Sequence, residues 1–308
     1  MIYDLIIVGG GPAGVASGVY AARKRLKTLL LTKEYGGQSA VSVDIQNWIG
    51  TPHISGNDLT KSFKMHLAEY QDNVLETKNG KAVASVTKKD DRFLVKMENG
   101  DSYTARAVLI ASGADRRKLT VPGAAKYEHK GVVYCASCDA PLFSKMPVAV
   151  IGGGNAGFET AAQLLAHASS VTLLEYEGSF KADSITVEKV LAHPNIKALT
   201  NVETIEIYGE QMVQGLKYKN RETNEIFNLA VSGVFVEIGL IPNTSLVEGF
   251  LELDSMKRIV INPKNQRTSV EGVWAAGDCT NELYHQNNIA AGSGVKALED
   301  IYMFLQTH

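Results

Sequence analysis

The sequence has few of the features that mark secreted, membrane or nucleic-acid-binding proteins. Its 308 residues include only three cysteines, an odd number that excludes a secreted framework of paired disulfides. No apolar run approaches the roughly 18 residues of a membrane span, and the amino terminus lacks the basic segment of a signal peptide. The formal net charge is −2, so the basic footprint of a general nucleic-acid binder is missing. We therefore expect a cytoplasmic protein with no membrane or nucleic-acid partner.

What remains is the composition of a folded globular chain. Hydrophobic residues make up 45% of the sequence and charged residues 21%, both near globular averages, which argues against extended disorder. At about 150 residues per domain, the length predicts two domains. A chain of this size can bury a full core without disulfides or metal.

One pattern occurs twice, 143 residues apart. Residues 6–14 read IIVGGGPAG and residues 149–157 read AVIGGGNAG, and the same offset pairs the later apolar runs 28–31 and 171–174. Each copy indicates a strand, a glycine turn, a helix with apolar residues three and four apart, and a second strand. Alternating runs and turn signals then predict an antiparallel meander in each half. The expected fold is α/β, with two Rossmann-like, three-layer dinucleotide-binding domains.

The segment after about residue 245 does not fit a third copy. It contains Gly277 and Asp278 after an apolar run, followed by a helical stretch from about residue 288, and these features would complete the first unit. We predict a discontinuous first domain, residues 1–114 and 245–308. The second domain, residues 115–244, would be inserted into it.

Both glycine loops have the spacing of a dinucleotide-binding turn. The first glycine permits a tight turn, the second lets a pyrophosphate approach the backbone, and the third lets the helix pack on the strand. The phosphate would lie at a helix amino terminus, where N–H groups and the helix dipole favour an anion. The alternative is two tight turns without a ligand, but two copies in a strand–loop–helix context favour nucleotides.

An acidic residue after the second strand of each unit would bind a ribose. Glu175 lies 23 residues after Gly152, the position of a carboxylate that accepts hydrogen bonds from a ribose 2′-OH. The matching position in the first unit is Thr32, and Glu34, two residues further on, is the ribose candidate there. For both glutamates the alternative is a solvated charge at a strand end.

Cys135 and Cys138 form a C-x-x-C motif that Asp139 follows directly. Two sulfurs this close can alternate between dithiol and disulfide, and a helix beginning here would favour the reactive thiolate. Asp139 is placed to exchange protons in thiol chemistry or to cap the helix start, and both roles can coexist. Zinc needs four ligands, and only Cys279 remains, with no histidine pair at ligand spacing, so we expect no metal site. Two buried, inert cysteines are the other alternative.

In combination and order, these motifs resemble the low-molecular-weight thioredoxin reductases and the reductase portion of the alkyl hydroperoxide reductase flavoprotein. Both are class II pyridine nucleotide-disulfide oxidoreductases, and the resemblance extends over essentially the whole chain. It implies that the first domain binds FAD and the second a nicotinamide dinucleotide. It also implies that Cys138 is the sulfur nearest the flavin, that Cys135 attacks the protein substrate, and that Asp139 is the general acid and base. A homodimer is expected from the family alone.

The resemblance also implies which residues bind the cofactors. Asp278 would hydrogen-bond the ribityl chain, and the helix beginning near Gln286 would direct its amino terminus at the flavin ring. The residues expected to contact FAD are Gly9, Gly11, Pro12, Ala13, Gly14, Glu34, Gly36, Gly37, Gln38, Asn47, Ala111, Gly113, Gly277, Asp278, Gln286 and Ile289. The residues expected to contact NADH are Gly152, Gly154, Asn155, Ala156, Gly157 and Glu175.

The chain departs from the family pattern at a few positions. Many relatives have glycine at the position of Ala140 and a basic residue at the position of His285. NADPH-dependent thioredoxin reductases carry His-Arg-Arg after the second strand of the nucleotide domain, whereas this chain reads Glu-Tyr-Glu at 175–177, closer to the hydroperoxide reductase flavoprotein. No arginine occurs between residues 152 and 220 to bind a 2′-phosphate. NADH is therefore expected to be preferred over NADPH.

Taken together, these patterns predict an FAD-dependent disulfide reductase. Electrons would pass from NADH through the flavin and the Cys135–Cys138 disulfide to a thioredoxin- or glutaredoxin-like protein. Because the first glycine loop begins at residue 9, that partner is expected on a separate chain. One alternative is an FAD-dependent dithiol oxidase with oxygen as acceptor, which would not need the second glycine loop. Another is a non-catalytic, nucleotide-sensing flavoprotein, which would not need the C-x-x-C.

Overall fold

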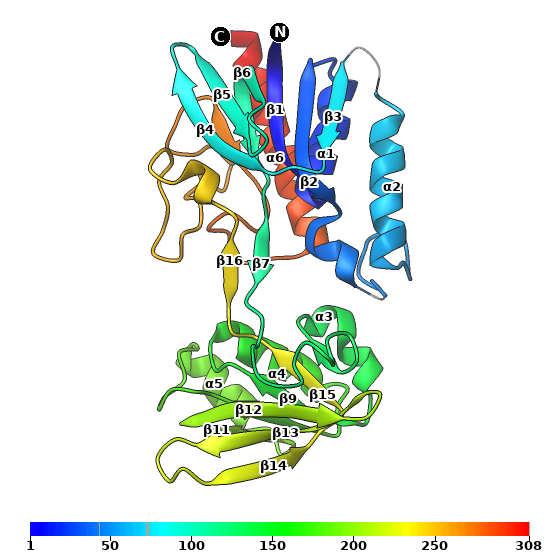
Figure 1. The fold of residues 1–308 in the computed structure, drawn as a ribbon, viewed down its shortest axis with the longest axis vertical. Helices are drawn as coiled ribbons and strands as arrows, with labels where there is room; N and C mark the ends of the chain where they lie inside the picture. Colours follow the sequence, from blue (N-terminus) through cyan, green and yellow to red (C-terminus); the bar gives the residue numbers. More distant parts are fainter. Residues whose placement is uncertain (43, 72–73, 308) are drawn as a thin grey trace. The chain divides into compact units, whose positions relative to one another are not determined.

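The computed structural model describes residues 1–42, 44–71 and 74–307, and the chain divides into two compact units (Figure 1). Unit 1 comprises Met1–Asp115 and Ile241–His308, and unit 2 comprises Arg116–Leu240. Residue 115 and residues 241–244, which we placed in the second domain, thus belong to unit 1. The reason is local hydrogen bonding, because the Asn243 N–H donates to the Gly113 carbonyl at 3.0 Å.

The chain passes between the two units in two strands that pair with each other. These are β7 (Ala114–Arg116) and β16 (Leu240–Pro242). The predicted boundary between residues 114 and 115 lies within β7, and the boundary between residues 244 and 245 lies shortly after β16.

Unit 1 is built on one sheet with the strand order β3-β2-β1-β6-β5-β4, in which β17 also pairs with β6. The four pairings β1–β2, β2–β3, β1–β6 and β6–β17 are parallel, whereas β4, β5 and β6 form an antiparallel meander. The predicted parallel strands and meander are therefore parts of a single sheet here. The strands are β1 (Ile2–Gly10), β2 (Thr28–Tyr35), β3 (Leu75–Asn79), β4 (Val83–Lys89), β5 (Arg92–Met97), β6 (Ser102–Ile110) and β17 (Val273–Ala275).

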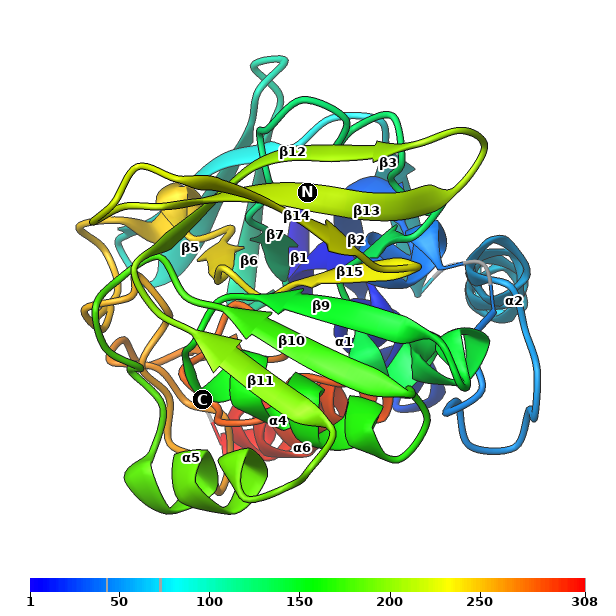
Figure 2. The same cartoon turned by 90° about the horizontal axis from the view of Figure 1, so that it is seen from below.

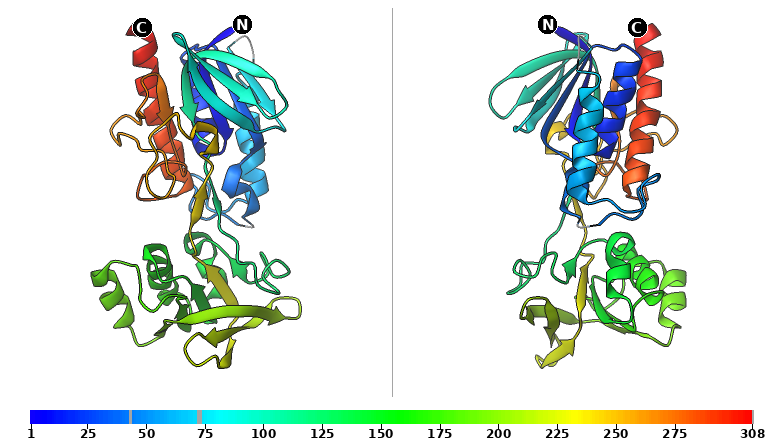
Figure 3. Two further views of the ribbon diagram at one scale, coloured as in Figure 1. Left: turned by 60° about the vertical axis from the view of Figure 1, so that its left-hand side comes forward. Right: turned by 90° about the vertical axis from the view of Figure 1, so that its right-hand side faces the viewer.

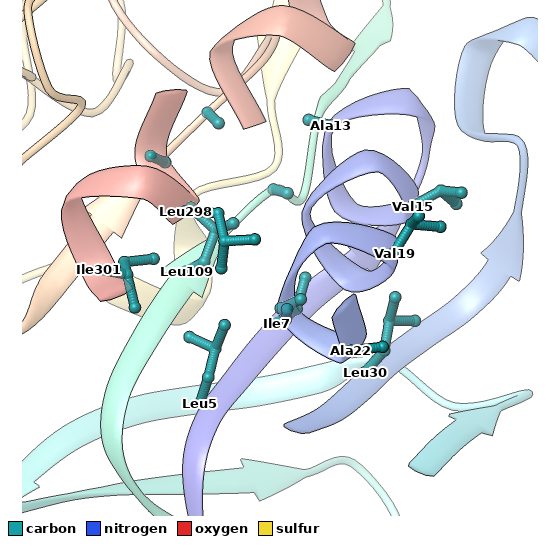
Figure 4. Close-up of a cluster of buried hydrophobic side chains, with 14 of the residues drawn as sticks. Leu5, Ile7, Ala13, Val15, Val19, Ala22, Leu30, Leu109, Leu298 and Ile301 are labelled. Atoms are coloured by element: carbon teal, nitrogen blue, oxygen red, sulfur yellow. The ribbon is translucent and has the colours of Figure 1, made fainter. Parts of the chain in front are cut away.

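Three helices cover one face of this sheet, and they lie side by side in the right-hand view of Figure 3. Leu5 and Ile7 of β1 pack against this helical layer, as the close-up in Figure 4 shows, while Ile6 and Val8 are buried on the opposite face. Both faces of β1 are thus buried, as is usual for a central parallel strand. The helices are α1 (Pro12–Arg23), α2 (Gly56–Ala68) and α6 (Asn287–Thr307), and short 3-10 turns occur at η1 (Gly37–Val41) and η3 (Ser245–Val247).

Unit 2 repeats this plan on a smaller parallel sheet with the order β11-β10-β9-β15-β8. Helices cover one face, and a separate three-stranded antiparallel meander covers the other (Figure 2). The parallel strands are β8 (Val132–Val133), β9 (Pro147–Ile151), β10 (Ser170–Leu174), β11 (Ile196–Leu199) and β15 (Gly233–Val236). The other elements are α3 (Ala136–Asp139), η2 (Ala140–Phe143), α4 (Asn155–Leu165), α5 (Ser184–Leu191), β12 (Val202–Gly209), β13 (Val213–Asn220) and β14 (Ile226–Ala230). The predicted fold class, α/β with two Rossmann-like domains, is confirmed.

The helices after the glycine loops begin directly after the second glycine of each loop. α1 begins at Pro12 and α4 at Asn155, because the second glycine of each loop is already the cap residue before the first turn. The backbone N–H groups of each first helical turn therefore lie at the loop itself. No helix among the described residues is long and apolar enough to cross a membrane.

Candidate functional site

The first glycine loop has the backbone geometry of a dinucleotide-binding turn. Gly9 has a φ of 123°, a conformation that residues with side chains rarely adopt. A Cβ on Gly14 would collide with the Gly9 carbonyl, so α1 packs directly against the turn. Around Gly11, in contrast, a Cβ would meet no described atom within 4 Å. The space above the second glycine is open, and a pyrophosphate could approach the backbone there.

The second loop repeats these features in unit 2. Gly152 has a φ of 114°, a Cβ on Gly157 would collide with the Gly152 carbonyl, and the space around Gly154 is open as far as the described residues extend. For both α1 and α4, the structure records no side-chain cap and no acidic residue in the first turn. Both helix starts therefore suit an anion, which fits the phosphates of FAD in unit 1 and of a nicotinamide dinucleotide in unit 2.

The predicted FAD-binding residues before α2 lie beside the first glycine loop. The Gly36 N–H donates to the Gly10 carbonyl at 2.9 Å, which brings η1 against the loop. A Cβ on Gly37 would lie 3.6 Å from Cα of Gly11. Gln38 Nε2 donates to Asp115 Oδ1 at 3.2 Å, so its side chain turns toward the segment after β6.

The same region of unit 1 holds the start of α6. Ser39 Oγ donates to Asn287 Oδ1 at 2.8 Å, and Asn47 Nδ2 donates to Gln286 Oε1 at 3.1 Å. Asn288 Nδ2 in turn donates to the Asn47 carbonyl at 2.6 Å. Segments about 240 residues apart in sequence thus meet at one helix start, as the predicted flavin site requires.

Asp278 follows β17 in a turn that packs against α1 and α6. The Gly277 N–H donates to Ser293 Oγ at 3.1 Å. Asp278 is half-buried, and its Oδ1 lies 3.4 Å from His285 Nδ1. That nitrogen is buried without a hydrogen-bond partner in the described part of the chain. The carboxylate and this nitrogen provide the polar atoms that ribityl hydroxyls would need, so these residues fit FAD.

The remaining predicted FAD contacts surround the loop less closely. The Ala111 carbonyl faces Gly9, the space around Gly113 is open among the described residues, and Ile289 in the first turn of α6 is 39% exposed. Glu34 contributes its backbone carbonyl, which accepts from the Thr32 hydroxyl, whereas its side chain is exposed. An exposed carboxylate agrees with the solvated strand-end alternative for Glu34.

Glu175, which directly follows β10, is buried, in contrast to the exposed Glu34. Its side chain is buried, with only 8% of the residue exposed. The carboxylate accepts hydrogen bonds from the Gly153 N–H in the glycine loop and from the Glu177 N–H at 2.8 Å. Glu175 is therefore not a solvated strand-end charge. It lies against the second glycine loop, where the ribose of a dinucleotide is expected.

Arg221 was not predicted as a site residue, yet it lies beside this acidic turn. Its guanidinium carbon is 3.7 Å from the centre of the Tyr176 ring, and its Nη1 donates to the Tyr176 carbonyl at 2.7 Å. The β12–β13 pairing brings it there, because Val202 pairs with Asn220 in that ladder. Arg221 is 46 residues after Glu175 in sequence, so no local pattern indicated the contact.

The two cysteines of the C-x-x-C lie at the start of α3 in unit 2. Cys135 and Cys138 are joined as a disulfide with a Cα–Cα distance of 5.3 Å, so they are not two separate inert thiols. No group of three or more His, Cys, Asp or Glu side chains in the described part of the chain could hold a metal ion. Cys279 belongs to unit 1, where burial raises the pKa of its thiol to about 11.

Asp139 ends α3 directly after Cys138. Its side chain makes no capping hydrogen bond to described residues, so capping alone does not account for its position. Burial raises the pKa of Asp139 to about 6, while the positive charges of His129 and Arg116 act in the opposite direction. A carboxyl with this pKa exchanges protons close to neutral pH, next to a disulfide that must gain protons when it is reduced.

Several known proteins match nearly the whole length of this chain. A sequence model described as pyridine nucleotide-disulphide oxidoreductase matches residues 3–294. An alkyl hydroperoxide reductase component from Escherichia coli is 40% identical over 304 residues, which are 98% of this chain and 58% of that protein. A protein named NADH dehydrogenase from Ferdinandcohnia aciditolerans is 39% identical over 303 residues, 98% of this chain and 57% of that protein. The chain thus spans little more than half the length of these relatives.

Solved structures agree over the full chain. The thioredoxin reductase from Giardia duodenalis has a TM-score of 0.92 and 32% identity, and the match covers 99% of both chains.

Proposed function

The chain belongs to the pyridine nucleotide-disulphide oxidoreductase family, and on that premise we propose that it is a flavoprotein disulfide reductase that uses NADH. FAD would bind in unit 1 and NADH at the glycine loop of unit 2. The observation that carries the proposal is the content of unit 2. A disulfide, a half-buried acid next to it and an open dinucleotide loop occur in one compact unit.

Each group in the two units has a chemical role in this reaction. When bound, FAD supplies the two-electron chemistry that links NADH to the disulfide. The Cys135–Cys138 disulfide accepts two electrons, the S–S bond breaks, and Asp139 holds a proton beside the released sulfurs. The Cys135 thiolate then attacks a disulfide of the partner to give a mixed disulfide. Attack by Cys138 on Cys135 releases the reduced partner and restores the starting disulfide.

The proposed acceptor is a thioredoxin- or glutaredoxin-like protein, and the proposed assembly is a homodimer. The open loop at Gly154 supports the reductase over a dithiol oxidase, which would not need it. The paired cysteines support it over a non-catalytic sensor. An anaerobic titration with NADH tests the proposal, because the flavin should bleach and the electrons should then reduce a thioredoxin-like protein. Oxygen uptake with dithiols, without bleaching by NADH, would favour the oxidase instead.

NADH should be preferred over NADPH by about 100-fold in kcat/KM, or roughly 3 kcal/mol. The 2′-phosphate of NADPH would lie beside Glu175 and Glu177. It replaces the 2′-OH that would donate a hydrogen bond to Glu175, and both carboxylates would repel its negative charge. Replacing residues 175–177 with His-Arg-Arg should narrow or invert the preference. Arg221→Ala removes the cation beside this turn and should widen it. Steady-state kinetics with both nucleotides measure the ratio of kcat/KM for NADH to that for NADPH in each variant. Equal kcat/KM values in the native protein would contradict the proposed role of Glu175.

The purified protein should be yellow and carry about one FAD per chain, as one dinucleotide loop in unit 1 implies. Asp278→Ala removes an acceptor for the ribityl hydroxyls and should weaken FAD retention during dialysis, measured by flavin absorbance per protein. Asp91→Ala, at an exposed acid in the β4–β5 turn, is the matched control and should retain FAD. A folded Asp278→Ala protein that holds FAD as tightly as the control would contradict this assignment.

A further inference from the structure

Tyr176 follows Glu175 directly in the acidic turn after β10, and it has no role in the proposed reaction. It is a large aromatic residue with 48% of its surface exposed. The guanidinium carbon of Arg221 lies over its ring, 3.7 Å from the ring centre, and Arg221 Nη1 donates to the Tyr176 carbonyl at 2.7 Å. Arg221 therefore covers one face of the ring and also bonds to the backbone that carries it.

Further hydrogen bonds fix this stacked pair relative to the ribose candidate. The Asn201 N–H donates to the Glu177 carbonyl at 2.9 Å, and the Arg221 N–H donates to the Asn201 carbonyl at 2.8 Å. The Glu177 N–H in turn donates to the Glu175 carboxylate at 2.8 Å. The segments before β12 and after β13 are thus bonded to the acidic turn, and the chain itself holds Tyr176 and Arg221 beside Glu175.

The covalent structure of NADH limits where its adenine can lie. The base is bonded to C1′ of the same ribose whose 2′-OH is assigned to Glu175, and C1′ and C2′ are adjacent atoms. A ribose held at Glu175 therefore places adenine at the acidic turn itself. Aromatic side chains offer flat surfaces on which nucleic-acid bases stack. With Arg221 on one face of the Tyr176 ring, adenine would stack on the opposite face.

We propose that Tyr176, held by Arg221, is the platform on which the adenine of NADH stacks. The inference rests on the proposed function, in which Glu175 binds the adenine ribose. Because Arg221 restrains the ring before the nucleotide binds, less freedom is lost on stacking. The platform acts on the adenosine half alone, and NADH and NADPH carry the same adenine. The alternative is that the stacked pair only stabilises the turn, and the two roles differ in which nucleotides a substitution affects.

Binding of ADP-ribose, which contains the adenine, its ribose and the pyrophosphate but no nicotinamide, tests the platform directly. Tyr176→Leu removes the ring but keeps an apolar side chain, and it should weaken ADP-ribose binding by about 10-fold. Tyr176→Phe keeps the ring and should bind with near-native affinity. Arg221→Ala leaves the ring unsupported and should weaken binding by about 3-fold. Tyr20→Leu, at a tyrosine of α1 that is 41% exposed, is the matched control and should bind like the native chain.

Isothermal titration calorimetry of the full, FAD-loaded chain measures these affinities, and steady-state kinetics separate stacking from a structural role. In Tyr176→Leu the KM for NADH should rise by about 10-fold. The ratio of kcat/KM for NADH to that for NADPH should stay native, as should kcat/KM for reduced nicotinamide mononucleotide, which lacks adenosine.

A disturbed turn would instead displace Glu175 and change the ratio between NADH and NADPH. Such a change, or equal affinity of the native chain and Tyr176→Leu for ADP-ribose, would overturn the platform while leaving the proposed reductase intact. If the native chain bound neither ADP-ribose nor NADH, the proposed function would fail as well, so the two failures can be told apart.

Discussion

Cys135→Ser and Cys138→Ser should each abolish reduction of a protein disulfide while leaving bleaching of the flavin by NADH largely intact. In the proposed reaction the flavin half-reaction precedes the dithiol half-reaction, so removing either sulfur should block only the later steps. Stopped-flow absorbance of the flavin follows the first half, and reduction of a thioredoxin-like protein follows the second. In both variants, reduction of the thioredoxin-like protein should fall to the background rate, whereas flavin reduction by NADH should not.

Cys279→Ala is the control for a general effect of thiol loss. Cys279 is fully buried in unit 1, and its sulfur lies near backbone carbonyls of that unit. Because the proposed electron path does not include this thiol, its replacement should leave both half-reactions at native rates. If the double variant lacking Cys135 and Cys138 still reduced a protein disulfide at the native rate, the assigned path would be wrong.

Local patterns predicted those parts of the molecule that depend on neighbours in sequence. The glycine loops at 9–14 and 152–157 demand a tight turn and an uncapped helix start, and both follow from residue type and spacing. The repeat at an offset of 143 then predicted the second unit from the first. Even the role of Thr32 follows this offset, since its hydroxyl faces the first loop as the carboxylate of Glu175 faces the second.

Contacts between distant segments could not be predicted in this way. Arg221 reaches Tyr176 only because the β12–β13 ladder returns the chain, and Arg116 meets Glu237 only because β7 and β15 end close together. The departure of the domain boundary from residue 245 has the same origin, since β16 pairs with β7. In the sequence, Arg221 and Arg116 resemble ordinary surface charges, and the segment of β16 resembles an irregular connection.

Two glutamates that occupy similar positions in the two sequence repeats differ in burial. Glu34 and Glu175 were both ribose candidates, yet Glu34 is exposed and Glu175 is bonded to the glycine loop. The difference arises because Glu175 directly follows β10 and lies against Gly153, whereas Glu34 stands two residues beyond the matching position. A two-residue displacement in a strand carries the side chain away from the loop.

Asp139→Asn should slow the dithiol half-reaction by about 10²–10⁴-fold, the usual contribution of a positioned acid or base. With its pKa raised to about 6, the native carboxyl donates a proton below that pH and accepts one above it. The native half-reaction should therefore show an ionisation near pH 6 that the variant lacks. Asp139→Glu keeps a carboxyl and should retain both the ionisation and much of the rate, which separates proton transfer from packing.

Unfolding gives a second readout of the same carboxyl that does not depend on catalysis. The pKa of Asp139 is higher in the folded chain than the ordinary value of about 3.9, so the folded state binds the proton more tightly. Its contribution to stability is greatest below pH 4 and is lost as the pH rises through 6. Asparagine cannot ionise, so the melting temperature of Asp139→Asn should rise relative to the native protein between pH 4 and pH 7. A native rate together with an unchanged difference in melting temperature would show that another group carries the proton.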